Sequence, residues 1–229
     1  MPLLTIPICL AIGIGSTLLI RSWKRTRLLP EEVALAVAWV FVVGGLVWLE
    51  AYLKGSTLLG FGPPWTWLAA AHFGAAGYGA LTVTALVCRT VSHLQAQCTL
   101  RVLLAVHPVA YLVTAAGISG VRYCSELGAL SYFVLFVVQL GAFFFGNPSR
   151  ISVGPRILLA LALAVPLGTI VPALAWAWQQ PLLDLGGMVK YHGVVNAIGH
   201  VGLGLLALGW GRPQSHAPFR EPASNALQS

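Results

Sequence analysis

Charge is what this sequence has least of. Asp, Glu, Lys and Arg together make up 8% of the 229 residues, whereas hydrophobic residues make up 58%. A soluble domain carries about 25% charged residues, so the composition excludes an ordinary soluble protein. Acidic residues are scarcest, six against 13 Lys and Arg, and the net charge is +7. The basic residues stand at the ends of apolar runs and form no stripe with interleaved aromatic residues, so we expect no nucleic-acid partner.

Cysteine is scarce too. The four residues Cys9, Cys88, Cys98 and Cys124 show neither the spacing of a metal site nor that of a disulfide framework. We therefore expect no disulfide, no bound metal and no cofactor. A secretory signal is also missing, because the first apolar run follows no basic residue and ends in the basic stretch 21–25. We expect this run to stay in the protein as a membrane helix.

Long apolar runs dominate what is present. A helix needs roughly 20 mostly apolar residues to cross a bilayer. Hydropathy windows predict an all-α, polytopic transmembrane helix bundle with about seven spans, at residues 3–20, 33–52, 65–88, 102–120, 129–145, 157–178 and 189–210. We expect one transmembrane domain at residues 1–212. Residues 213–229 are polar and rich in Pro, Ser, Asn and Gln, which predicts a disordered cytoplasmic tail.

The distribution of basic residues predicts the orientation of the chain. If the amino terminus lies outside, ten basic residues fall in inner segments and only Lys54, Arg122 and Lys190 fall outside. Lys and Arg collect in the cytoplasmic loops of membrane proteins. We therefore expect a multi-pass protein of the cell inner membrane, with its amino terminus outside and its carboxyl terminus in the cytoplasm.

Few polar groups lie inside the predicted spans. An ionisable side chain in the hydrocarbon costs about 2.5–3.5 kcal/mol, so each one needs a partner, a cavity or a function. The candidate catalytic residues are Glu50, His72, His192, Asn196 and His200. The last three follow one another at four-residue steps and share one helix face, while Glu50 and His72 lie at the depth of His192. His107 falls near the inner end of its predicted span and is left out of the site.

Simpler explanations remain open for these residues. Glu50 can pair with Lys54 one turn later, and the histidines can form hydrogen bonds with neighbouring helices. Glycine and alanine flank His72 and the later stripe, which predicts either close helix packing or the walls of a pocket. Pro30 followed by Glu31 and Glu32 is typical of a helix start, with carboxylates near its positive end.

Two segments carry a resemblance to a known family. The first is Gly60-Phe61-Gly62-Pro63-Pro64 leading into His72-Phe73-Gly74-Ala75-Ala76-Gly77-Tyr78, and the second is His192-Gly193-Val194-Val195-Asn196-Ala197-Ile198-Gly199. Together they resemble the YndJ-like family of bacterial polytopic membrane proteins, over roughly the third and seventh spans. The chain departs from the family pattern at Gly74, where a second histidine is expected, and at His200, where an aromatic residue is expected. The resemblance implies that His72, His192 and Asn196 form the site.

Four functions fit these observations. The first is an intramembrane enzyme that cyclises or isomerises a hydrophobic isoprenoid- or polyketide-like substrate, or opens its epoxide, with Glu50 or a protonated histidine as acid and another histidine as base. A membrane transporter of the YndJ-like type would use the same groups as a proton relay or solute site. A zinc-dependent intramembrane hydrolase is a third, although His192 and His200 lie about 12 Å apart along their helix, too far for one metal. The fourth is an accessory protein. The oligomeric state and the substrate stay open.

Overall fold

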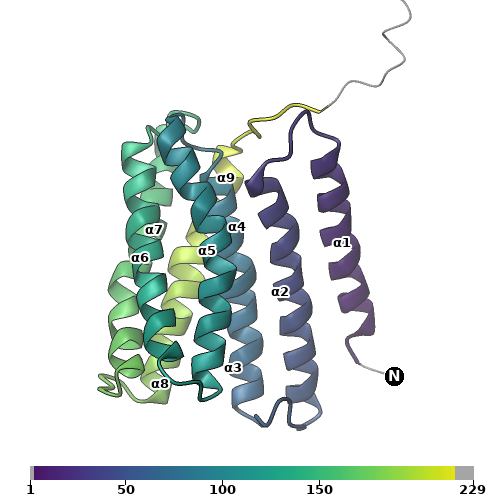
Figure 1. The fold of residues 1–229 in the computed structure, drawn as a ribbon, viewed down its shortest axis with the longest axis vertical. Coiled ribbons are helices and arrows are strands. Elements are labelled where there is room, and N and C mark those ends of the chain that lie inside the picture. The colour runs from purple at the N-terminus through teal and green to yellow at the C-terminus, as the bar shows by residue number, and fades with distance from the viewer. Residues whose placement is uncertain (1–2, 220–229) are drawn as a thin grey trace, which may run out of the picture.

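Seven long helices run back and forth through the computed structural model, which describes residues 3–219 (Figure 1). Each span is long and apolar enough to cross a membrane, so the predicted all-α, seven-span bundle is confirmed. Five spans contain a single helix: α1 (Thr5–Trp23), α2 (Pro30–Leu53), α5 (Leu94–Ile118), α6 (Cys124–Phe145) and α7 (Val153–Ala177).

The third and seventh spans are composite. The third consists of α3 (Trp65–His72), the π-helical segment η1 (Phe73–Gly79) and α4 (Ala80–Val87). The seventh consists of α8 (Leu185–Gly187), the π-helical segments η2 (Met188–Val194) and η3 (Asn196–Gly202), and α9 (Leu203–Gly211). A π-helical turn is rare in proteins and is frequently found at functional sites. Here all three segments lie in the two spans that carry the candidate residues His72, His192, Asn196 and His200.

One predicted boundary is wrong in a way that matters. The fourth span was expected to begin at residue 102, but α5 begins at Leu94. Polar residues in the first two turns lower the hydropathy, yet Gln97 is buried and donates to the carbonyls of Val91 and Ser92, and Arg101 pairs with Glu31. The helix therefore starts two turns earlier, and His107 stands near its middle.

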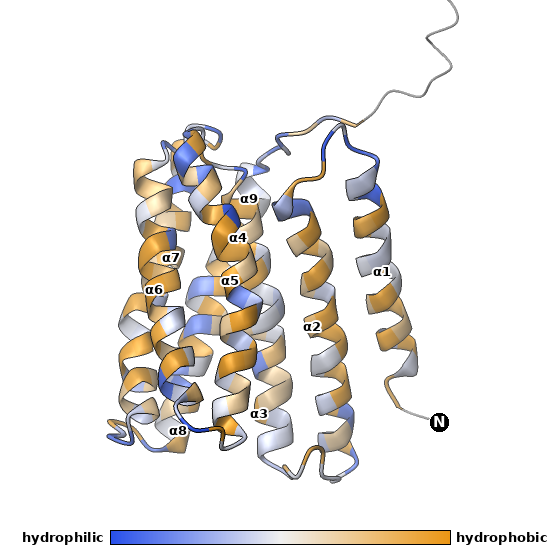
Figure 2. Cartoon of the chain, in the orientation of Figure 1, coloured by the Kyte–Doolittle hydropathy of each residue, from blue (hydrophilic) through white to orange (hydrophobic). Residues whose placement is uncertain are grey.

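The third span lies in the middle of the bundle. In Figure 1 α1 stands at the edge against α2, and α3, η1 and α4 pass between α2 and α5. Most of the largest fully buried side chains come from α4, α5, α6 and α7, among them Leu81, Leu100, Phe143 and Leu159. Figure 2 shows apolar residues along most of each helix, and hydrophilic residues at the helix ends and between α5 and its neighbours.

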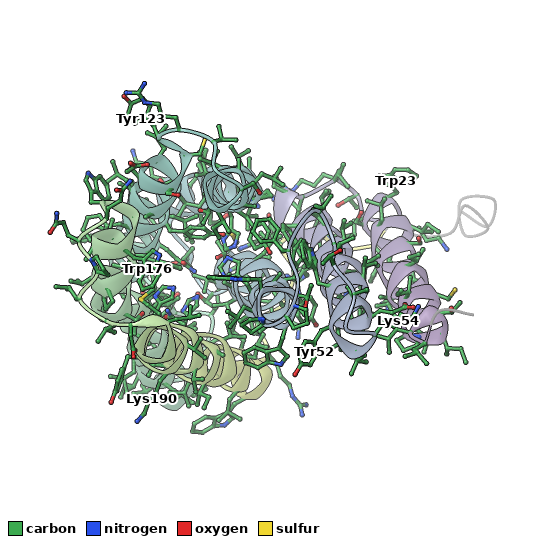
Figure 3. All side chains as sticks on the ribbon, turned by 90° about the horizontal axis from the view of Figure 1, so that it is seen from below. Trp23, Tyr52, Lys54, Tyr123, Trp176 and Lys190 are labelled. Atoms are coloured by element: carbon green, nitrogen blue, oxygen red, sulfur yellow. The ribbon has the colours of Figure 1, made fainter. Side chains whose placement is uncertain are left out.

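The two ends of the bundle differ in charge. At one end of the bundle α1 and α9 finish and α2, α5 and α7 begin, and we call this end the basic face. We call the other end the opposite face. Basic residues at or beside the basic face include Arg21, Lys24, Arg25, Arg27, Arg89, Arg150, Arg156 and Arg212. At the opposite face, which Figure 3 views from below, Tyr123 and Lys190 point away from the bundle. Which face lies in the cytoplasm stays a prediction.

Residues 213–219 lie across the basic face. The backbone N–H of Thr26 donates to Pro218, the Arg25 guanidinium donates to the Ala217 carbonyl at 2.6 Å, and His216 Nε2 donates to the Cys88 carbonyl at 3.0 Å. The guanidinium of Arg25 also stacks on the Phe219 ring, 4.4 Å from its centroid. The rest of the tail that was expected to be disordered, residues 220–229, lies outside the described residues.

Candidate functional site

Four histidines from three spans approach one another inside the bundle. His72 ends α3, His107 stands near the middle of α5, and η2 and η3 supply His192 and His200. His72 is close enough to His192 and to His107 for electrostatic interaction, and His107 is in turn close enough to His200. The structure therefore brings together three of the predicted site residues and adds His107, which the sequence analysis had left out.

Backbone carbonyls determine the tautomer of three of these rings. A carbonyl oxygen only accepts, so the ring nitrogen next to it must carry the proton. His107 Nε2 donates to Ala76 at 2.8 Å, His192 Nδ1 donates to Thr169 at 2.8 Å, and His200 Nδ1 donates to Ala162 at 3.0 Å. In each neutral ring the other nitrogen is left with a lone pair, which makes it a proton acceptor.

Two of those nitrogens, and one on His72 whose tautomer no carbonyl determines, lie buried without a partner in the described part of the chain. His107 Nδ1, His200 Nε2 and His72 Nε2 are buried, and none has a hydrogen-bond partner within residues 3–219. An unpaired buried polar atom costs about 1–3 kcal/mol, so each one calls for an explanation. Three such nitrogens in one cluster make it the candidate functional site.

The η1 segment explains how His107 finds its acceptor. In an α-helix the carbonyl of Ala76 would accept from the amide four residues later, whereas a π-helix displaces that pairing by one residue. Ala76 lies in the middle of η1, and its oxygen accepts from His107 on the neighbouring helix. The small residues after His72 form this π segment. They also let α2 and η3 approach, since a Cβ atom on Gly77 would overlap Phe41 and one on Gly79 would overlap Val201.

Aromatic rings enclose His72. The imidazole stacks on Tyr111 of α5 with centroids 5.1 Å apart and planes at 25°. Phe41 and Phe73 meet the same tyrosine edge-on, with centroids at 4.8 and 5.1 Å. Phe41 and Tyr111 are buried. The free nitrogen of His72 is therefore in a dry, aromatic environment.

Asn196 and Thr169 hold the end of the cluster nearest the opposite face. The Thr169 hydroxyl donates to Asn196 Oδ1 at 2.8 Å, and the carbonyl of the same threonine accepts from His192. Asn196 Nδ2 stands 3.5 Å from His192 Nδ1, but both atoms are donors in this tautomer, so the hydroxyl contact is the one that positions the amide. Asn196 therefore acts on His192 through Thr169 and α7.

Glu50 has different neighbours. Its carboxylate accepts from Lys54 Nζ at 2.5 Å and from the backbone N–H of Leu3 at 3.2 Å. These contacts tie the opposite-face end of α2 to the start of α1, at the edge of the bundle (Figure 1). The geometry thus agrees with the simpler pairing weighed for this residue, and the catalytic role of Glu50 stays a prediction.

A groove runs along the α2 side of the third span. It has a volume of about 510 Å³ and is almost wholly apolar, with Trp39, Leu46, Trp67, Gly74 and Tyr78 among its lining residues. A Cβ atom on Gly74 would meet nothing within 4 Å. The groove passes the position next to His72 along the chain, while the His72 ring turns the other way, toward Tyr111.

Comparison with known proteins identifies the family. The model of the YndJ-like protein family matches residues 5–200, which include all the candidate residues. The chain belongs to the YndJ-like family. It is 27% identical over 208 residues to the uncharacterized membrane protein YndJ of Bacillus subtilis (strain 168), an alignment that covers 88% of this chain and 36% of that protein. This chain therefore spans little more than a third of its relative. No solved structure matches the chain.

The family match confirms the resemblance read from the third and seventh spans, and the chain is a multi-pass membrane protein of the YndJ-like family. The two positions at which it departs from the expected YndJ-like pattern have different surroundings. Gly74 faces the open groove, and His200 lies in the buried cluster with its ring edge-on to Phe136.

Metal ligands and a reactive thiol would be alternatives to the histidines in this YndJ-like chain. Within residues 3–219 no three His, Cys, Asp or Glu side chains are placed to hold a metal ion together. Cys88 lies just beyond α4 and is fully buried, and burial raises the pKa of its thiol, which keeps it protonated. The histidines are therefore the candidate groups for acid–base chemistry.

Proposed function

We propose that this YndJ-like protein is an intramembrane enzyme in which buried histidines move protons on a hydrophobic substrate. The observation that carries the proposal is the set of three buried, unpartnered ring nitrogens on His72, His107 and His200. A neutral imidazole with a bare lone pair is a base, and once protonated the same nitrogen is an acid. The cluster contains both roles without a carboxylate.

The chemistry is proton transfer within one substrate molecule. One protonated ring gives its proton to a double bond or an epoxide oxygen, which leaves positive charge on carbon. A neutral ring then removes a proton from a neighbouring carbon, and a new double bond forms. Isomerisation and cyclisation both follow this course, and the substrate neither gains nor loses protons overall. His72 and His107 fit these roles because each carries a free nitrogen in the same cluster.

The surroundings favour a hydrocarbon substrate. Tyr111 stacks on His72, and Phe41 and Phe73 pack against Tyr111, so aromatic rings lie beside the cluster. The face of an aromatic ring attracts positive charge when water is absent. The apolar groove beside α3 and η1 contains no histidine, so it would hold only the unreactive tail of an isoprenoid- or polyketide-like chain taken from the bilayer, and the reacting end would have to pass η1 to reach the histidine cluster.

The test is a comparison of membrane lipids. Cells that express the wild type, His72→Phe, His107→Leu or His93→Leu would be extracted and their lipids compared by mass spectrometry. His93 is an exposed histidine just before α5, so His93→Leu is the matched control. We expect a hydrophobic species to be converted with the wild type and the control but not with the other two variants. Identical extracts from all four strains and from cells without the protein would refute the proposal.

A further inference from the structure

Buried polar atoms continue from the histidine cluster toward the basic face. Besides the three ring nitrogens, the atoms without a hydrogen-bond partner within residues 3–219 include Tyr132 Oη, Thr82 Oγ1 and Gln139 Oε1. All three residues are at least nine-tenths buried, and all come from α4 or α6, the helices that pack beside the cluster. Proteins seldom leave so many buried polar groups unpaired in one region, and ordered water is their usual partner.

Ring contacts connect the first part of this series. The Tyr132 ring meets His107 edge-on at 5.4 Å between centroids, and Phe136 one turn later meets His200 at 5.4 Å. Gln139 follows Phe136 by three residues, so it lies on the same face of α6, one turn nearer the basic face. This face of α6 therefore runs past both histidines toward the basic face.

The next step reaches α4. Gln139 Nε2 donates to the Thr84 hydroxyl at 3.2 Å, and that hydroxyl donates to Ala80 at 2.8 Å. Gly204, one turn beyond His200, packs so closely on Val83 that an added Cβ atom would stand 3.1 Å from its methyl group. Since Val83 precedes Thr84, the pair formed by Gln139 and Thr84 lies about one helical turn, roughly 5 Å, nearer the basic face than His200.

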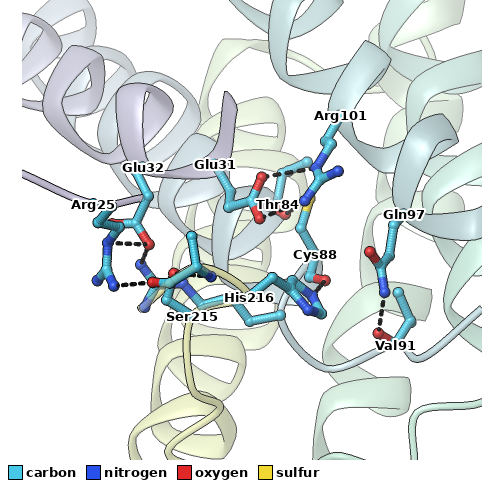
Figure 4. Close-up of polar contacts among 12 residues, drawn as sticks. Arg25, Glu31, Glu32, Thr84, Cys88, Val91, Gln97, Arg101, Ser215 and His216 are labelled. Carbon is cyan, nitrogen blue, oxygen red and sulfur yellow. Dashed lines mark hydrogen bonds and ion pairs between the residues drawn. The ribbon is translucent and has the colours of Figure 1, made fainter. Parts of the chain in front are cut away.

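The series ends among ionised groups at the basic face. Cys88 follows Thr84 by one turn and is close enough to Glu31 and Arg101 for electrostatic interaction. Glu31 is fully buried and accepts from both Arg101 Nε and Arg101 Nη2 at 2.9 Å. His216, which is only partly buried, donates to the carbonyl of Cys88, as Figure 4 shows. Among these groups Arg101 and His216 are partly exposed, so this end of the series is the one nearest to solvent.

We infer that Gln139, Thr84 and the unpaired groups beside them form a proton path between the basic face and the histidine cluster. The inference rests on the proposed acid–base function, because such a path would return the cluster to its starting protonation state between turnovers. Each transfer is balanced: a proton binds a ring nitrogen, hydroxyl or water on one side and an equivalent proton leaves on the other. No other bond changes and no electrons are exchanged. Gln139 and Thr84 are positioning residues that order the path.

The experiment measures proton exchange and needs no substrate. Protein with ¹⁵N-labelled histidine rings would be reconstituted in lipid bilayers, and magnetisation transfer from water to the ring nitrogens of His107 and His200 would be recorded by solid-state NMR. Three variants would be compared with the wild type: Thr84→Val, Gln139→Leu and Thr66→Val. Thr66 is the matched control, since it is also fully buried and lies in the same span, but near the opposite face.

We expect transfer to both rings in the wild type and in Thr66→Val, and loss of most of it in Thr84→Val and Gln139→Leu. Valine keeps the volume of threonine, so Thr84→Val decides the matter if Gln139→Leu does not fold. Absence of transfer in the wild type, or full transfer in Thr84→Val, would overturn the path. The lipid comparison is independent: unchanged lipids together with the expected NMR result would refute the enzyme and leave the path standing.

Discussion

Gly77 of η1 lies so close against Phe41 of α2 that a Cβ atom at this position would overlap the phenyl ring. Gly74, three residues earlier in the same π segment, has nothing within 4 Å of its Cβ position. The two glycines therefore differ in their surroundings and share their backbone conformation, which makes them a matched pair.

Gly77→Ala should destabilise the protein, and Gly74→Ala should not. The added methyl group at residue 77 must push Phe41 away from Tyr111, and overpacking of this kind costs about 1–3 kcal/mol. Thermal unfolding in detergent, followed by tryptophan fluorescence, measures the difference. Equal melting temperatures for both variants would mean that α2 and η1 pack less tightly than the structure describes.

Removing one partner of the Glu31–Arg101 pair should destabilise the protein more than removing both partners. Arg101→Leu leaves a fully buried carboxylate without its bidentate partner, and breaking a buried pair in this way costs about 3–5 kcal/mol. Glu31→Leu combined with Arg101→Leu removes both charges and should recover most of that loss. A double-mutant cycle in denaturant measures the coupling, and additive losses would show that the two residues act separately.

His107→Leu should cost stability as well as function. The substitution removes the hydrogen bond from His107 to the Ala76 carbonyl, and the loss of one such bond costs about 0.5–1.5 kcal/mol. His93→Leu, at the exposed start of α5, serves as the control and should unfold like the wild type. If His107→Leu matched that control, the hydrogen bond to Ala76 would not be formed in the protein.

Docking of residues 213–219 should weaken in acid. Burial lowers the pKa of His216 below its ordinary value of about 6.5, and the nearby Arg150 and Arg101 act in the same direction, while the Cys88 carbonyl and Glu31 oppose them. The undocked segment therefore binds a proton more readily than the docked one. Docking should be complete above about pH 6.5 and should be lost as the pH falls below it.

A fluorophore on Ser215→Cys, in a background without the native cysteines, would report this transition. His216→Gln keeps a donor for the Cys88 carbonyl but does not titrate, so its signal should not change over the same range. A signal that falls in both proteins would assign the acid effect to another group.

The predicted orientation can be tested with cysteines at the two faces. If the amino terminus is outside, Arg122→Cys should react with a membrane-impermeant maleimide in intact cells, whereas Arg150→Cys should react only after the cells are opened. The reverse pattern would place the basic face outside the cell.

Much of the fold follows from the sequence alone. Crossing a bilayer demands long apolar helices whatever their neighbours, so composition and hydropathy determined the seven spans. The pattern of Pro30 followed by Glu31 and Glu32 located the start of α2. The family was recognisable for a similar reason, because the histidine, glycine and asparagine residues of the third and seventh spans stand in local patterns. His72, His192 and His200 could be selected because charged or polar groups are rare in such helices.

Only the tertiary structure decided which of these groups meet. His107 was misplaced because the first two turns of its helix contain Gln97 and Arg101. Their partners Val91 and Glu31 stabilise these polar turns and are invisible to a hydropathy window. The tautomers of the histidines depend on carbonyls of Ala76, Thr169 and Ala162 on other helices. Depth along one helix is a local property, whereas the partner across an interface depends on how helices rotate and pack, and that information is spread over the whole chain.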